Sequence, residues 1–283
     1  MPAPVGAAAG PGALTGLLEV ERSGVNDAVV RVTLDRPDVH NAFNEVLIDE
    51  LRRLFRRLAD EPPERLRVVV LAGAGPSFCA GADVNWMRAS LGLTRDQNEQ
   101  DAMAMAEMFD AIDRCPVPVI ARVHGAALGG GMGLCAVSDL VIAEAGTRFG
   151  FTETRLGILP AVISPFVIAK IGETQARALF PGGRRFDATR ALRIGLVHEV
   201  VEGTDALDEA VEVAIDDLLA SGPTAVRAAK SIVREVRGLP HESTRWHTAR
   251  CIAAQRTSRE GQEGLRAFLD KRRPSWSSPD REA

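Results

Sequence analysis

Three short, largely apolar segments most constrain the fold of this chain. They are VVVLAG at 68–73, VPVIARV at 117–123 and LVIAEA at 140–145, and segments with helical periodicity separate them. A short apolar run bounded by turn residues is typical of a strand buried on both faces. Strands that alternate with helices form a parallel sheet, because each crossover helix returns the chain to the same edge. We therefore predict an α/β fold with a parallel sheet.

The two ends of the chain differ from this middle part. Strand patterns at 17–20 and 28–34 come first, and a helix that Asn41 or Asn44 can cap follows them. After Val201 the strand patterns give way to three helical segments. The predicted organisation is a flexible tail at 1–16, a core at 17–204 and a helical C-terminal region for oligomerisation at 205–283.

The composition excludes several classes of protein. The chain has 283 residues, of which 46% are hydrophobic and 25% charged, and its net charge is −4, unlike the strongly basic surface of a general nucleic-acid binder. Its four cysteines form no CxxC pair and its five histidines no HExxH motif, so we predict no metal site. The N-terminus lacks the basic region of a signal peptide, and charged residues interrupt the apolar stretch at 117–142. We expect a reducing, cytoplasmic location and no membrane or nucleic-acid partner.

Two segments each place a strand before a loop of small residues and a probable helix. They are 68–83 (VVVLAGAGPSFCAGAD) and 119–134 (VIARVHGAALGGGMGL). Each loop can present a backbone N–H group at a helix start, and two converging donors would form an oxyanion hole. Glycine suits such a loop because it lets a substrate approach the backbone closely. The segment 131–136 also fits GxGxxA, a dinucleotide-binding pattern, but it does not directly follow the first strand of the fold.

A glutamate follows the second of these loops. Glu153 lies in FGFTETRLGILP, at 149–160. A carboxylate beside a polarised carbonyl group can move protons, which makes Glu153 a candidate acid/base. Its position alone also fits an ordinary surface glutamate.

Several of these motifs together resemble the crotonase, or enoyl-CoA hydratase/isomerase, superfamily. The motifs with the clearest likeness are FCAGAD at 78–83, HGAALGGGMGL at 124–134 and FGFTETRLGILP at 149–160. The likeness continues in the same order through LDRPDVHNAFN at 34–44, RFDATRALRIGLVHEVV at 185–201 and LRAFLDKRRPSW at 265–276. Three further pieces resemble bacterial methylglutaconyl-CoA hydratases in particular: RPDVHNAF at 36–43, DVNWM at 83–87 and LPAVISPFVIAKIG at 159–172.

The resemblance implies a fold, an assembly and a set of site residues. The fold would be the ClpP/crotonase-like spiral of ββα units with a helical C-terminal region, assembled as a homotrimer or a dimer of trimers. The N–H groups of Ala80 and Gly130 would hold the thioester oxygen of an acyl-CoA, and Glu153 would move the proton. The residues implied to contact CoA are Asp38, Val39, His40, Gly81, Ala82, Asp83, Phe268 and Lys271, the last two in some cases from a neighbouring subunit.

One position departs from the pattern of the two-glutamate hydratases of this superfamily. Gly133 stands where those enzymes have one glutamate, whereas Glu153 matches the other. We therefore expect hydration of a 2-enoyl-CoA thioester with a single glutamate and no cofactor except the CoA of the substrate. The alternatives are a Δ3,Δ2-enoyl-CoA isomerase with the same residues and, more remotely, a non-catalytic RNA-binding protein that uses the arginines at 52–57.

Overall fold

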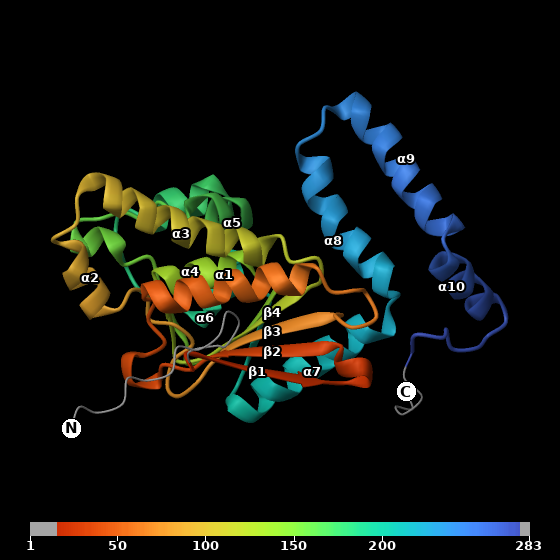
Figure 1. Cartoon of the computed structure of the whole chain (residues 1–283), viewed down its shortest axis with the longest axis horizontal. Coiled ribbons are helices and arrows are strands. Elements are labelled where there is room, and N and C mark those ends of the chain that lie inside the picture. Colours follow the sequence, from red (N-terminus) through yellow and green to blue (C-terminus); the bar gives the residue numbers. More distant parts are fainter. Residues whose placement is uncertain (1–15, 278–283) are drawn as a thin grey trace, which may run out of the picture.

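A six-stranded sheet forms the centre of the molecule in the computed structural model, which describes residues 16–277 (Figure 1). Its strands, in spatial order, are β1 (Leu18–Ser23), β2 (Val29–Leu34), β3 (Val68–Gly73), β4 (Val119–Val123), β6 (Leu140–Glu144) and β9 (Glu199–Val201). β1 pairs with β2 in the antiparallel sense, and every other neighbouring pair is parallel. The predicted α/β fold with a parallel sheet is therefore confirmed. The predicted tail lies outside the described residues, except for Gly16.

A second, smaller sheet begins where the chain leaves the first one. It consists of β5 (Ala126–Leu128), β7 (Arg148–Gly150) and β8 (Phe186–Asp187). β5 follows β4 after a turn at Gly125, which has a φ of 63° and lies against the Pro76 carbonyl oxygen with no room for a Cβ. β4, β5 and α4 (Gly130–Val137) thus form one ββα unit, and β6, β7 and α5 (Ser164–Leu179) form the next.

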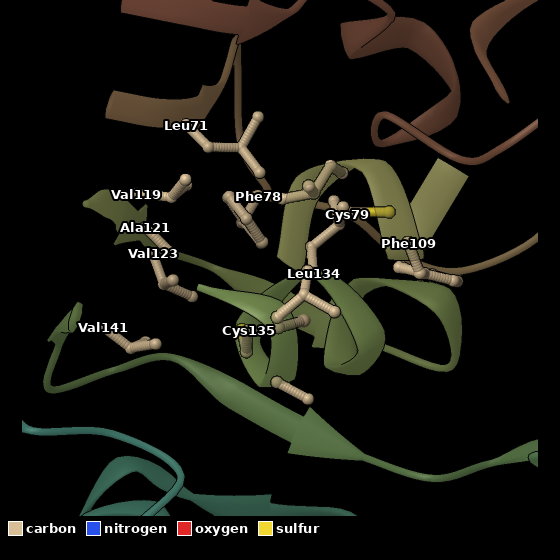
Figure 2. Packing of buried hydrophobic residues seen from close by; sticks show 14 of the residues in the cluster. Leu71, Phe78, Cys79, Phe109, Val119, Ala121, Val123, Leu134, Cys135 and Val141 are labelled. Atoms are coloured by element: carbon tan, nitrogen blue, oxygen red, sulfur yellow. The ribbon is translucent and has the colours of Figure 1, made fainter. Parts of the chain in front are cut away.

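Helices cover both faces of the larger sheet. On one face lie α1 (Glu45–Ala59), which the Asn44 side chain caps, and α4, with α3 (Arg95–Asp113) packed against both of these helices. Alternate residues of β4 divide between the two faces, since Val119 and Ala121 join the α4 side while Ile120 joins the other side. Figure 2 shows side chains from β3, β4 and β6 gathered around Leu134 and Cys135 of α4. α4 is therefore buried in the core of the molecule.

The opposite face is covered by α7 (Thr204–Ala220). Leu207, Val211 and Ile215 are buried there against Val68 and Ile142 and other valines and isoleucines of the sheet. The predicted helical region thus begins with α7, and this first helix completes the core of the sheet domain. The helices that extend away from this domain in Figure 1 are α8 (Pro223–Arg237), α9 (His241–Thr257) and α10 (Arg259–Leu269).

The two remaining α-helices of the described residues are short: α2 (Val84–Ser90) and α6 (Ala188–Arg193). No helix within residues 16–277 has both the length and the apolar character that crossing a membrane requires.

Candidate active site

The first of the two predicted loops is held in place by a buried asparagine. Asn41 has a positive φ of 57° and is fully buried. Its Nδ2 donates to the carbonyl oxygens of Ala74, at 2.8 Å, and Ser77, at 2.7 Å, while its Oδ1 accepts from the Arg36 N–H group at 2.8 Å. Asparagine tolerates the left-handed conformation better than most residues, and its amide replaces three backbone partners at once. The loop that leads to Ala80 is therefore rigid.

The backbone hydrogen bonds of this loop distinguish the N–H group of Ala80 from that of Ala82. The Ala80 N–H group donates to the His40 carbonyl oxygen at 2.9 Å, so it is already engaged within the protein. This bond contradicts the prediction that Ala80 supplies an oxyanion-hole donor. Ala82 instead forms a parallel bridge with Phe43 through its two neighbours, Gly81 and Asp83. This pairing leaves the N–H group of Ala82 without an acceptor among the described residues, and Ala82 is partly exposed.

The second loop presents the unpaired N–H groups at the start of α4. Gly129 precedes the helix with φ 49° and ψ −114°, a conformation that is essentially restricted to glycine, and its N–H group donates to Gly150 of β7 at 3.0 Å. The N–H group of Gly130 belongs to the first turn, where no intrahelical acceptor exists, and it donates to no described residue. A Cβ on Gly130 would lie 2.6 Å from the Phe43 ring. The packing therefore requires glycine at the position that carries the free donor.

The two loops and Glu153 meet at one place. A Cβ built on Gly129 would lie 3.7 Å from the Cα of Gly81 and 3.6 Å from the Oε1 atom of Glu153. Glu153 begins a 3₁₀ turn (Glu153–Leu156) directly after β7, and Thr154 anchors this turn by donating to the Phe180 carbonyl oxygen at 3.0 Å. The structure thus brings Glu153 beside the junction of the loops that carry Ala82 and Gly130.

The Glu153 carboxyl group is poorly solvated. Its Oε2 atom is buried and accepts no hydrogen bond from the described residues. Burial raises the pKa of the Glu153 carboxyl group, and the backbone N–H of the same residue opposes this only in part. A raised pKa suits a group that has to take up a proton and return it during one reaction cycle.

The side of α4 that bears Gly133 is filled by apolar side chains. A Cβ at position 133 would lie 2.5 Å from Cγ2 of Ile163 and 2.6 Å from Cζ of Phe109. Both of these side chains are buried in the main core. A second carboxylate at this position would meet Ile163 and Phe109 at its first side-chain carbon, so this side of α4 offers no partner for Glu153.

The cysteine beside the first loop is unsuited to acid/base chemistry. Burial raises the pKa of the Cys79 thiol to about 12, although the Gly81 backbone and the charge of Arg36 oppose this shift. Burial likewise raises the pKa of Cys135 in α4 to about 12. Neither thiol is ionised near neutral pH, and both contribute to the core.

Asp83 has a structural role that the sequence analysis missed. Its carboxylate pairs with the Arg36 guanidinium group at 2.6 Å and accepts from the Asn85 N–H group, which caps α2. Burial alone would raise the pKa of Asp83, but the hydrogen bonds from Arg36 and Asn85 outweigh it, and the pKa is lowered. The carboxylate is therefore occupied within the protein, whereas Gly81 lies buried beside Gly129 and Ala82 is partly exposed.

The structure groups some of the predicted CoA-contacting residues and separates others. Asp38 and Val39 lie in a 3₁₀ turn (Pro37–Val39) and His40 follows it, next to the first loop, where the His40 ring lies 3.0 Å from the Ser77 hydroxyl group. Phe268 is 80% exposed at the end of α10, and Lys271 follows it. α10 packs on α8 and α9, at the other end of the molecule from α2 (Figure 1). Within one chain, Phe268 and Lys271 are thus not part of the group around Glu153.

These features define a class of α/β protein that is built of ββα units and places two loops with free backbone N–H groups beside one carboxylate. The sequence model of the family described as enoyl-CoA hydratase/isomerase matches residues 24–279. A putative enoyl-CoA hydratase/isomerase of Bacillus subtilis, YngF, is 33% identical over 252 residues, which cover 88% of this chain and 94% of the relative. The chain belongs to the enoyl-CoA hydratase/isomerase family, the crotonase superfamily.

Solved structures agree with this assignment. An enoyl-CoA hydratase from Shewanella pealeana superposes with a TM-score of 0.85 at 38% identity, over 92% of this chain and 96% of that one. AtuE of Pseudomonas aeruginosa superposes with a TM-score of 0.88 at 37% identity, over 93% of this chain and all of that one. The predicted crotonase fold with a helical C-terminal region is confirmed.

Proposed function

We propose that this acyl-CoA-processing enzyme adds water to a 2-enoyl-CoA thioester, with Glu153 as its only carboxylate acid/base. The observation that carries the proposal is the position of the buried Glu153 carboxyl group, 3.6 Å from where a Cβ of Gly129 would lie, at the meeting point of two loops with free N–H groups. Donors aimed at a thioester oxygen stabilise the enolate that forms when a nucleophile attacks C3. We assign these donors to Ala82 and Gly130.

One carboxylate is sufficient for the proton balance of this reaction. The ionised Glu153 takes a proton from water while the water oxygen bonds to C3 and the C2–C3 π electrons move into the thioester enolate. The protonated Glu153 then returns that proton to C2, and the enolate collapses to the 3-hydroxyacyl thioester. The net change is the addition of one water across the double bond, and the raised pKa of Glu153 makes its carboxylate a stronger base for the first transfer. The CoA of the substrate is the only cofactor that this route requires.

The lack of space for a second carboxylate also favours one alternative reaction. A Δ3,Δ2-enoyl-CoA isomerase needs a single group that moves a proton between C4 and C2, and the packing of Phe109 and Ile163 at Gly133 leaves Glu153 as such a group. The name of the Bacillus subtilis relative includes both the hydratase and the isomerase activity. Hydration remains our proposal, because Glu153 can serve water and C2 in turn.

A nucleic-acid-binding role is less compatible with the surface. In the arginine cluster of α1, Arg52 and Arg56 both pair with Glu107 of α3, at 2.8 Å and 3.1 Å, and Arg53 pairs with Asp49. These carboxylates neutralise much of the charge that a phosphate backbone would need. We therefore retain the prediction that nucleic acid is not a partner.

We also propose a cytoplasmic location. The four free cysteines are compatible with the reducing conditions of that compartment.

We also propose that the enzyme forms a homotrimer or a dimer of trimers through its C-terminal helices. Large apolar side chains are exposed on α8, α9 and α10, at Val233, Trp246, Ile252, Leu265, Phe268 and Leu269. Exposed apolar surface of this kind is typical of a subunit interface. In such an assembly Phe268 and Lys271 would approach the CoA bound by a neighbouring subunit.

A panel of thioesters tests the proposed reaction. The purified enzyme is assayed with 2-enoyl-, 3-enoyl- and 3-methylglutaconyl-CoA, and the products are separated and weighed by mass spectrometry. We expect a product 18 Da heavier than a 2-enoyl substrate, the mass of one water. Conversion of a 3-enoyl substrate to a 2-enoyl product without a mass change, in the absence of any hydration, would replace our proposal by the isomerase.

The donor assignment is tested with paired variants. Ala82→Pro removes the N–H group, and kcat should fall by about 10²–10³. Ala82→Gly keeps the N–H group and is the matched control, with kcat expected near the wild-type value. Circular dichroism checks that both variants are folded, and a folded Ala82→Pro enzyme with normal kcat would contradict the assignment.

A further inference from the structure

Three side chains with metal-binding chemistry converge between α8 and α9, away from the site around Glu153. Nε2 of His247 lies 2.6 Å from Oε2 of Glu235 and 3.6 Å from Sγ of Cys251. One ligand atom from each residue lies within 4.8 Å of the other two. His247 and Cys251 are four residues apart on α9, so they share one face of that helix, and Glu235 reaches them from α8.

The arrangement does not form a catalytic relay. In a relay, a histidine uses one ring nitrogen for the nucleophile and the other for the carboxylate. Here the carboxylate and the thiol both approach Nε2 of His247. Donors that converge on one point suit a cation that they can share.

The distances fit a small tetrahedral ion. With Zn–S near 2.3 Å and Zn–N near 2.0–2.1 Å, a tetrahedral ion holds its sulfur and nitrogen ligands about 3.6 Å apart. The observed distance between Cys251 Sγ and His247 Nε2 is 3.6 Å. The Glu235 oxygen lies at hydrogen-bond distance and has to withdraw by about 0.7 Å to become a ligand of such an ion. The half-exposed Glu235 side chain, 39% accessible, has room for this movement.

The surroundings support the same function. The Ser231 hydroxyl group, one helical turn before Glu235 on α8, donates to Oε1 of Glu235 and leaves Oε2 directed to His247. A partner that fixes the second oxygen of a carboxylate is a common feature around metal ligands. A surface hollow lined by Leu239, Trp246 and His247 adjoins the cluster through His247.

We propose that Glu235, His247 and Cys251 bind one divalent cation of the zinc class, with water as the fourth ligand. A thiolate, an imidazole and a carboxylate form a borderline-soft donor set that zinc prefers over magnesium or calcium. The ion would join α8 to α9, two helices that extend away from the sheet domain (Figure 1). The search for paired cysteines or histidines in the sequence missed this site, because its i,i+4 pair is a histidine with a cysteine.

Metal binding by the full chain tests the proposal. The protein is treated with a chelator, dialysed under reducing conditions and titrated with ZnCl₂ by calorimetry, and Co²⁺ serves as the spectroscopic probe. We expect one Zn²⁺ per chain and a thiolate-to-cobalt charge-transfer band. Cys251→Ser should abolish this band, and Glu235→Gln should weaken Zn²⁺ binding at least about tenfold, since even outer-shell partners contribute 10–100-fold to affinity.

His241→Gln is the matched control, because His241 is an exposed histidine at the start of the same helix and lies outside the cluster. It should leave the affinity and the charge-transfer band unchanged. The absence of saturable Zn²⁺ binding in the wild type, or equal binding by the wild type and Cys251→Ser, would overturn the proposal. These measurements read binding alone, so their outcome is independent of the reaction proposed for Glu153.

Discussion

Replacing Glu153 by glutamine should remove activity and increase stability at the same time. Oε2 of Glu153 is buried without a partner, and burial raises the pKa of this carboxyl group, so the folded enzyme is destabilised by its ionised form. An unpaired buried polar group costs about 1–3 kcal/mol, and more when it is charged. Because the glutamine amide is also unpaired, we expect a gain of about 1 kcal/mol at pH 7, at the low end of that range. A gain of this size corresponds to about 2 °C in Tm for a chain of this length.

The pH dependence identifies the carboxyl group as the cause. A pKa raised in the folded state means that the unfolded chain loses this proton first as the pH rises, so stability falls above the ordinary value of 4.5. The Tm difference between Glu153→Gln and wild type should therefore be near zero at pH 4 and grow toward pH 7. Turnover of the best substrate should fall by about 10²–10⁴.

Thermal melts from pH 4 to pH 8 and steady-state assays measure both effects. Glu19→Gln, at an exposed position in β1, is the control and should change neither of them. A Glu153→Gln variant that is less stable than wild type at pH 7, or whose Tm difference is the same at all pH values, would refute the electrostatic reasoning. Near-normal turnover would refute the catalytic role.

Three further predictions concern packing and assembly. Gly133→Ala places a methyl group 2.5 Å from Ile163 and 2.6 Å from Phe109, so chemical denaturation should show a loss of about 1–3 kcal/mol, and an unchanged midpoint would contradict this packing. Asp83→Asn leaves the Arg36 guanidinium group without its charged partner, and denaturation should show a loss of about 3–5 kcal/mol; a loss below 1 kcal/mol would show that the pair is dispensable. Light scattering of the full chain should give the mass of a trimer or of two trimers, and a monomer at micromolar concentration would exclude the proposed assembly.

The sequence predicted the elements whose hydrophobic pattern is strong. The apolar runs at 68–73 and 140–145 match β3 and β6 closely, and the capping asparagine of α1 was one of the two candidates. The short strands of the smaller sheet were missed, because two or three residues carry too little periodicity to be recognised. The packing of α7 on the sheet was not predicted, since an amphipathic pattern shows that one face of a helix is covered but not which element covers it.

The candidate site was predicted in its parts but not in its details. The two small-residue loops and Glu153 do meet, as the resemblance to the crotonase superfamily implied. The error at Ala80 arose because the sequence does not show which backbone N–H groups already donate a hydrogen bond within the protein. The Ala80 N–H group donates to the His40 carbonyl oxygen. Asn41 and Arg36 were missed for a related reason: their role is to satisfy backbone and carboxylate groups that only the folded chain brings near them.

The filled space beside Gly133 restricts how this active site can change over evolutionary time or in directed evolution. A glutamate introduced at position 133 meets Ile163 and Phe109 at its first side-chain carbon, before its carboxylate is reached. A two-carboxylate site therefore requires smaller residues at 109 and 163 together with the new glutamate, and each of these core truncations alone is costly. The glutamate alone overpacks the core and each truncation alone leaves a cavity, so we expect every single substitution to be less stable than the wild type. A library that varies the three positions together is the practical route to a second carboxylate beside Glu153.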